Sequence, residues 1–76
     1  MKRVKGFVMA GDRVAGKTVW KVRVKDRGFQ LNGKKLIVAS VHEGIELLQG
    51  LNVSFLIGTF QENGERVSKA MDVQLR

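Results

Sequence analysis

Apolar and polar residues alternate along two stretches near the start of the chain. From Val19 the sequence reads VWKVRVK, which places Trp20, Val22 and Val24 on one side of an extended chain and basic residues on the other. Residues 4–9 alternate in the same way, with two valines and a glycine sharing one side. A period of two residues is typical of a β-strand that buries one face. The pattern therefore predicts two strands here.

Three later runs are apolar enough to form further strands. They are KKLIVASV (34–41), VSFLIGTF (53–60) and AMDVQLR (70–76). In the last run, alternation predicts that Met71, Val73 and Leu75 point inward. The chain contains no proline, so none of the five predicted strands is interrupted by one.

Two Asn-Gly pairs, at residues 32–33 and 63–64, indicate tight hairpin turns of type I′, because both residue types tolerate positive φ. The first pair predicts the link between the second and third strands. The Asp-Arg-Gly stretch at 26–28 is then either a bend within that hairpin or the turn itself. The second pair predicts the link between the fourth and fifth strands.

Residues 40–50 (SVHEGIELLQG) break the strand pattern and carry helix signals. Ser40 and Glu43 have the spacing of a capping box, and Gly50 stands where a helix favours a left-handed terminating residue. The segment also has one apolar stripe, formed by Val41, Ile45 and Leu48. We expect about two turns of helix that plug one end of a barrel.

The predicted order is three strands, a short helix and two strands. This layout predicts an all-β protein, a five-stranded OB-fold Greek-key barrel with the helix between strands three and four. We expect one such domain over residues 1–76. An SH3-like barrel is the second choice, because it usually lacks a capped helix at that position.

Net charge narrows the expected partners. Lys and Arg number 14 against 7 Asp and Glu, which gives a formal charge of +7 and favours anionic partners. On the solvent side of the second strand, Lys21, Arg23 and Lys25 follow one another at about 6.6–6.8 Å, twice the rise per residue of a strand. That spacing is near the distance between phosphates along a single nucleic-acid strand. The alternative interpretation is that this row of cations only forms a solvated face, which keeps a small barrel soluble.

Four short motifs resemble the cold-shock domain group of OB-folds. They are KGFV (5–8), LIVAS (36–40), GLNVSF (50–55) and AMDVQL (70–75). The resemblance implies binding of single-stranded nucleic acid by outward aromatic residues of strands one to three. The first-strand aromatic positions read Ala10 and Gly11 here, and the aromatics and histidine of the third strand are replaced by Ile37, Val38 and Ala39. The stacking surface that the family uses is therefore largely missing.

The sequence thus predicts a small basic module that holds single-stranded RNA or DNA on a basic face of strands one to three. The residues expected to bind nucleic acid are Lys5, Phe7, Arg13, Lys17, Lys21, Arg23, Lys25, Lys34 and Lys35. Phe7 is the best candidate for stacking on a base. Trp20 is expected in the core unless a bulge near residues 17–18 turns it outward, and Phe29 fits either role. The alternative is a protein-interaction module that docks an acidic partner through the same face.

The segment GDRVAGKT (11–18) fits the phosphate-loop pattern G-x-x-x-x-G-K-[ST]. Such a loop leads from a strand into a helix, whose N-terminus faces the phosphates. Here the next residues are VWKVRVK, which have the period of a strand. We therefore expect a hairpin connection carrying Arg13 and Lys17, and no nucleotide cofactor.

Other chemistry finds little support in the sequence. The chain has no cysteine and one histidine, His42, which is expected to be an exposed bystander, so we expect no metal site and no cofactor. No serine and acid are arranged around that histidine, and we expect no enzyme activity. No apolar run is long enough to span a membrane, and the expected location is cytoplasmic.

Overall fold

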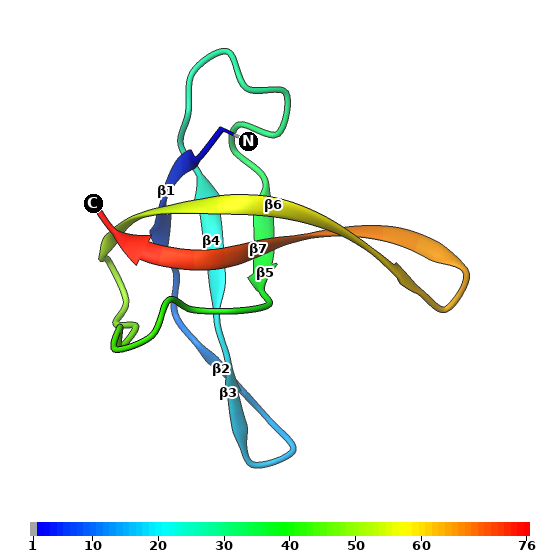
Figure 1. Ribbon diagram of the computed structural model, residues 1–76. Helices are drawn as coiled ribbons and strands as arrows, with labels where there is room; N and C mark the ends of the chain where they lie inside the picture. The colour runs from blue at the N-terminus through cyan, green and yellow to red at the C-terminus, as the bar shows by residue number, and fades with distance from the viewer. Residues whose placement is uncertain (1) are drawn as a thin grey trace.

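The computed structural model describes residues 2–76, and its body is a closed barrel of five strands (Figure 1). The barrel strands are β1 (Val4–Val8), β4 (Lys21–Val24), β5 (Lys35–Val38), β6 (Asn52–Glu62) and β7 (Glu65–Leu75). Their order around the barrel is β1-β4-β5-β7-β6, and β6 pairs back onto β1. All neighbours are antiparallel except β5 and β7, which run parallel. The prediction of an all-β barrel is confirmed.

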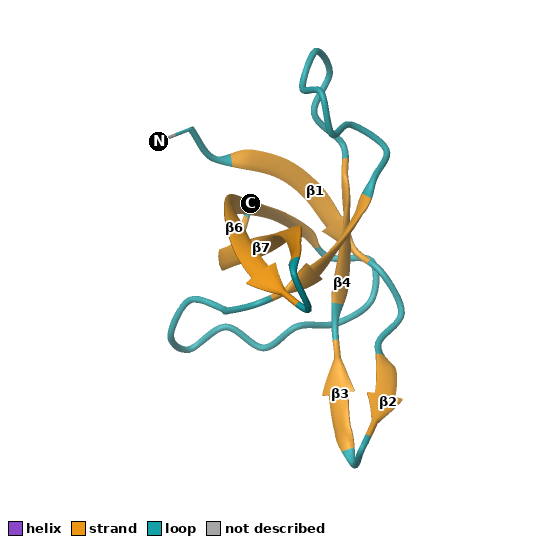
Figure 2. Ribbon diagram, turned by 90° about the vertical axis from the view of Figure 1, so that its right-hand side faces the viewer, coloured by secondary structure: helices purple, strands orange, loops and turns teal. Residues whose placement is uncertain are grey.

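A separate two-stranded ribbon joins β1 to β4. It consists of β2 (Asp12–Val14) and β3 (Lys17–Val19), which pair only with each other. The ribbon projects from one end of the barrel, whereas the far half of the β6–β7 hairpin projects in another direction (Figures 1 and 2). The barrel therefore carries two β-ribbon arms.

The core confirms the alternation read from the first two strands. On β1 the residues Val4, Gly6 and Val8 are buried, and on β4 the residues Val22 and Val24 are fully buried. The whole buried apolar set is Val4, Val8, Val22, Val24, Leu36, Leu47, Val53, Phe55, Ala70 and Val73. These residues come from all five barrel strands and from the loop before β6, so the barrel interior is the hydrophobic core.

The helix predicted at residues 40–50 is wrong, because no helix forms in the described chain. The start of this segment runs beside β7 instead, where the Ala39 amide donates to the Ala70 carbonyl and the His42 amide to the Val73 carbonyl. Ser40 does not cap a helix either, since its hydroxyl accepts a hydrogen bond from a β7 amide. Backbone partners on β7 therefore replace the local hydrogen bonds that a helix would need.

The same segment still covers one end of the barrel, as expected. Leu47 is buried in the core, while Val41 and Ile45 pack against it half-buried. Leu48, which the helical stripe placed inward, is 64% exposed. Gly50 has a φ of 91°, the left-handed conformation expected of it, but in a loop rather than at a helix end.

A bulge interrupts β7 at Asp72, whose φ is 50°. The pairing with β6 shifts between Ser54 and Leu56, so that Asp72 and Val73 together lie opposite Phe55. A left-handed residue that adds one position to a strand is a β-bulge, and it leaves local backbone groups without ladder partners.

The bulge changes which β7 residues face the core. Ala70 and Val73, three positions apart, are both buried. Val73 therefore points inward as predicted, but Met71 is only half-buried and Leu75 is 52% exposed. Alternation was wrong for Met71 because the bulge lies between Met71 and Val73. Leu75 pairs with the buried Val53, but it is the last residue of β7 and is exposed there.

The Asn-Gly pair at 63–64 forms the predicted turn, with φ values of 51° and 79°. The pair at 32–33 does not, because only Gly33 has positive φ. The connection from β4 to β5 instead contains two successive turns, in which the Phe29 amide donates to the Asp26 carbonyl and the Asn32 amide to the Phe29 carbonyl. Residues 26–28 therefore contribute a turn of their own.

Candidate nucleic-acid interface

The outer side of β1, β4 and β5 brings several of the predicted binding residues together. Phe7 lies opposite Arg23, and Arg23 lies opposite Lys35. Directly opposite residues on one side of an antiparallel pair have Cβ atoms about 4.5–5.5 Å apart. These three residues therefore form one row across the barrel surface.

Further residues extend this row on both sides. Ile37 pairs with Lys21 on β4 and with Lys69 on β7, which makes a second row. Lys5 and Lys25 are joined through a backbone hydrogen bond of 2.9 Å and lie beyond the first row. We name the whole surface the basic face; it comprises Lys5, Phe7, Lys21, Arg23, Lys25, Lys35, Ile37 and Lys69.

Every charged residue of the basic face is a cation. Arg23 donates to the Gly33 carbonyl oxygen over 2.7 Å, and the Lys21 ammonium lies 3.6 Å from a carboxylate oxygen of Asp12. Lys69 forms an ion pair with Glu62 on the neighbouring strand. Within residues 2–76 no ion pair involves the remaining lysines of the face, which are Lys5, Lys25 and Lys35. All three are exposed. The carboxylate of Asp26 lies beside them and accepts a hydrogen bond from the Lys5 amide over 3.2 Å, but cations outnumber carboxylates on and around the face.

Phe7 is the aromatic residue of the basic face. Its ring is half-buried, and the Lys25 ammonium lies 6.0 Å from the ring centroid. Trp20 and Phe29 are half-buried and pack against the core. Both residues therefore pack at the margin of the core and are not among its buried residues.

The segment GDRVAGKT forms the β2–β3 ribbon (Figure 2). Its turn residues Ala15 and Gly16 have φ values of 50° and 79°, a type I′ turn. No helix follows in the described chain, so the segment is a connection between two strands, as expected, but it forms a two-stranded ribbon of its own rather than a loop. Arg13 pairs with Thr18, and Lys17 is the neighbour of Thr18 along β3. Because adjacent residues of a strand point to opposite sides, Arg13 and Lys17 face opposite sides of the ribbon, and neither belongs to the surface formed by β1, β4 and β5.

Two positions of the basic face were missed by the sequence reasoning, and one predicted position lies outside it. Lys69 and Ile37 meet only because β5 and β7 pair in parallel, a contact between distant parts of the chain. Lys34 immediately precedes β5, and alternation places it on the side of the buried Leu36 rather than of Lys35. The one signal for Lys69 was its place on an alternating strand next to the core residue Ala70.

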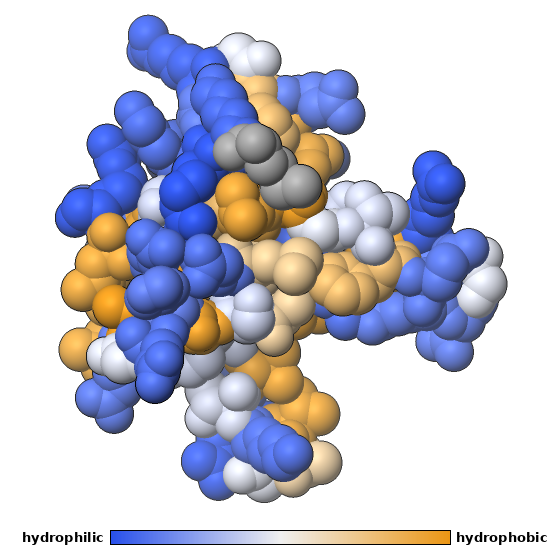
Figure 3. Space-filling model, viewed as in Figure 1, coloured by the Kyte–Doolittle hydropathy of each residue, from blue (hydrophilic) through white to orange (hydrophobic). Residues whose placement is uncertain are grey.

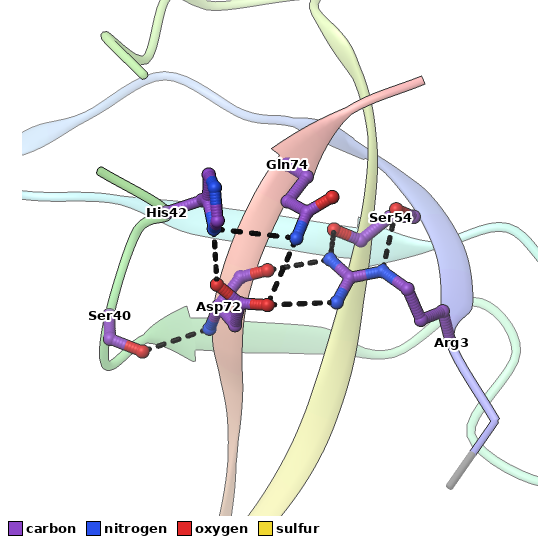
Figure 4. Close-up of polar contacts among 6 residues, drawn as sticks. All are labelled: Arg3, Ser40, His42, Ser54, Asp72 and Gln74. Atoms are coloured by element: carbon purple, nitrogen blue, oxygen red, sulfur yellow. Dashed lines mark hydrogen bonds and ion pairs between the residues drawn. The ribbon is translucent and has the colours of Figure 1, made fainter. Parts of the chain in front are cut away.

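A second polar group surrounds the bulge of β7 (Figure 4). The Arg3 guanidinium donates to a carboxylate oxygen of Asp72 over 3.0 Å and to the Asp72 carbonyl oxygen over 2.6 Å. It also donates to the hydroxyl and the carbonyl oxygen of Ser54 on β6. Arg3 therefore supplies donors at the place where the bulge disturbs the β6–β7 ladder.

The loop after β5 contacts the same bulge. The Asp72 amide donates to the Ser40 hydroxyl over 2.8 Å, and the Nδ1 atom of His42 lies 3.0 Å from an Asp72 carboxylate oxygen. Gln74 donates to the other carboxylate oxygen over 3.1 Å. His42 is exposed as expected, but it is a partner of Asp72 rather than a bystander. We name the group the Asp72 cluster; it comprises Arg3, Ser40, His42, Ser54, Asp72 and Gln74.

These contacts favour the ionised form of Asp72. The hydrogen bond with His42 is the largest influence that holds the pKa of Asp72 below its usual value. Hydrogen bonds from Arg3 and Gln74 act in the same direction, and burial opposes them. Each polar group of Asp72 has a partner within the chain. The cluster therefore links β7 to two other segments, which are the start of the chain and the loop that follows β5.

Comparisons with protein-family models, curated proteins and solved structures found no match to this chain. The described residues contain neither a pocket nor a group of acidic, histidine and cysteine side chains that could hold a metal ion. Across residues 2–76 there is also no helix that could cross a membrane.

Proposed function

We propose that this chain is an OB-fold module that binds single-stranded RNA or DNA across the basic face. The strand order supports the fold. Around the barrel β6 lies beside β1, followed by β4 and β5, so the fourth barrel strand returns to lie next to the first in Greek-key order. In OB-folds the surface of the second and third strands binds oligonucleotides, and in this chain those strands are β4 and β5.

One observation carries the proposal: cations lie directly opposite one another on this surface. Arg23 faces Lys35 across the β4–β5 pair, and Lys25 adjoins Lys5 across the β1–β4 pair. Like charges directly opposite each other in a sheet lower stability. A polyanion would remove this repulsion, whereas solubility alone requires only scattered charge.

The arrangement suggests how a strand would lie. Lys21, Arg23 and Lys25 follow β4 at about 6.6–6.8 Å intervals and can contact successive phosphates. Phe7 beside Arg23 can stack on one base, and the exposed Ile37 offers apolar contact to another. Binding would be dominated by phosphate contacts, with weak dependence on base sequence.

The test is the salt dependence of binding to homopolymer RNA and DNA. For single strands the log–log slope is roughly −0.7 per phosphate contacted. Replacing Lys21, Arg23 and Lys25 together by alanine should weaken binding to all sequences and flatten the slope by about 2 units. The matched control is the triple alanine variant of Lys2, Arg66 and Arg76, three exposed cations outside the face. It removes the same charge and should change the slope far less; equal effects of the two variants would contradict the proposed face.

Phe7→Leu separates stacking from charge. Loss of a stacked base costs about 1–3 kcal/mol, or roughly 5- to 150-fold in affinity, and it should leave the salt slope unchanged. Because Phe7 is the single aromatic of the face, docking of an acidic protein is the second candidate function. Absence of any oligonucleotide binding by the unmodified chain at low salt would reject the nucleic-acid proposal in favour of that second candidate.

A further inference from the structure

The strand β6 continues well beyond the barrel wall. Its first residues pair with β1, but that pairing ends at Phe55. From Leu56 to Glu62, β6 has β7 on one side, and no described residue pairs with its other side. This free edge belongs to the arm that projects from the barrel (Figures 1 and 2).

The hairpin geometry shows which backbone groups are free. A two-residue type I′ turn makes its flanking residues, Glu62 and Glu65, a hydrogen-bonded pair. Hydrogen-bonded and non-hydrogen-bonded pairs then alternate along the hairpin. The N–H and C=O groups of Ile57, Thr59 and Gln61 therefore point away from β7, toward the open side.

This edge lacks the usual protection against strand pairing. Exposed edges commonly carry lysine, proline or an inward charge. The run between Glu46 and Glu62 contains no charged residue, and it is the longest such run in a chain of charge +7. By contrast, the partner strand presents Glu65, Arg66 and Lys69. Figure 3 shows apolar side chains continuing from the barrel into this arm, with hydrophilic ones at its tip.

We propose that the free edge of β6 pairs with the same edge of a second copy of this chain, antiparallel and centred on Thr59. Two chains of charge +7 repel each other, so close approach is least unfavourable where both surfaces carry no charge. The edge of β6 is such a surface, because residues 47–61 contain no charged residue. A twofold axis at Thr59 places the two Thr59 residues opposite each other and Ile57 opposite Gln61. Each of these pairs exchanges two N–H···O bonds, which uses the groups that are free in one copy.

The proposal predicts a salt response opposite to that of nucleic-acid binding. Salt screens the repulsion between the two basic barrels, so dimerisation should strengthen as salt rises. Sedimentation equilibrium of the intact chain, from low salt to about 1 M salt where the Debye length is about 3 Å, measures this directly. A chain that stays monomeric at high salt, or that forms open-ended aggregates rather than dimers, overturns the proposal.

Thr59→Lys tests the edge itself. Thr59 is exposed, so the fold should persist, but two added lysines would face each other at the centre of the dimer. We expect a monomer under conditions where the unmodified chain dimerises. The control is Thr18→Lys, the same change at an exposed threonine of the β2–β3 ribbon, which should dimerise normally. Dimerisation of Thr59→Lys as strong as that of the control rejects the edge.

A cysteine at the centre tests the register, because the chain has no cysteine of its own. Opposite residues in a hydrogen-bonded pair have Cα atoms about 5.5 Å apart, within the disulfide range. Thr59→Cys should therefore cross-link rapidly under mild oxidation at high salt, and Thr18→Cys should not. If Thr59→Cys chains dimerise without cross-linking, the proposed register is wrong and the proposal fails.

Discussion

Asp72 shows why single residues limit what a sequence pattern can predict. Alternation correctly predicted the buried sides of β1 and β4, because those short strands have no irregularity. On β7 the left-handed conformation of Asp72 shifts the alternation by one residue. Aspartate tolerates that conformation better than most residues, but it also occurs in ordinary strands and turns, so its identity alone does not reveal a bulge.

The lowered pKa of Asp72 leads to a prediction about acid stability. Its carboxylate is stabilised in the folded chain, which therefore binds fewer protons than the unfolded chain. This contribution is fully present above the usual carboxylate pKa and is lost as pH falls through the lowered one. We expect Asp72→Asn to be less stable than the unmodified chain at neutral pH and the difference to shrink in acid.

Urea unfolding over a series of pH values measures that difference. Glu43→Gln removes one negative charge from an exposed position outside the Asp72 cluster and should show no comparable difference. The groups that face Asp72 are Arg3, His42 and Gln74. A stability gap that stays constant from neutral to acidic pH would mean that the cluster does not act through the charge of Asp72.

At the scale of elements, the five barrel strands were predictable, whereas the β2–β3 ribbon and the segment between β5 and β6 were not. Each strand combines local alternation with a turn or glycine nearby, so sequence neighbours carry the information. Residues 40–50 have the local features of a helix, but Gly44 is left-handed and the segment start pairs with β7. Those partners lie some thirty residues away along the chain, and no local pattern reports them.

The two type I′ turns differ in their first residue, which gives a second prediction. Ala15 and Asn63 both have φ near 50°, but the left-handed region costs alanine more than asparagine. We expect Ala15→Asn to stabilise the β2–β3 ribbon by about 1 kcal/mol and Asn63→Ala to destabilise the β6–β7 hairpin by about 1 kcal/mol.

Amide hydrogen exchange at each hairpin reports these changes locally, and thermal unfolding reports whether they reach the whole barrel. Because β2 and β3 pair only with each other, the Ala15 effect should stay within that ribbon. The Asn63 effect should extend further, since β7 lies between β5 and β6. Equal global effects of the two substitutions would contradict this difference.

At the scale of the molecule, the sequence predicted the cations but not their grouping. Net charge and the alternation of β4 indicated Lys21, Arg23 and Lys25 without any knowledge of neighbours. The inclusion of Lys69 and the exclusion of Lys34 depend on how strands pair around the barrel. Which distant strands pair is set by closure of the whole sheet, and the local alternation of apolar and polar residues carries no information about it.

If the positive charge of the basic face is concentrated for binding, repulsion between its cations should lower the stability of the free chain. Lys35→Glu replaces a like-charge pair with Arg23 by an opposite pair, and should stabilise the free chain by about 0.2–1 kcal/mol. The same change should weaken oligonucleotide binding. The control is Lys34→Glu, at the adjacent position outside the basic face, which alters the net charge equally. It should change both the stability of the free chain and its affinity for oligonucleotides less than Lys35→Glu does. A Lys35→Glu chain that is no more stable, yet binds normally, would remove the argument for the face.

The central position of β7 has a consequence for synthesis of the chain. β7 follows the other barrel strands in sequence, but it lies between β5 and β6 and is paired with both. During translation the earlier barrel strands emerge from the ribosome before β7. Until β7 pairs with them, the facing edges of β5 and β6 have no partner. Until residues 65–75 emerge, the nascent chain is an open sheet whose uncharged β6 segment is accessible to other chains. Holdase chaperones should therefore bind ribosome-stalled chains that end before residue 65 and release those in which β7 has emerged.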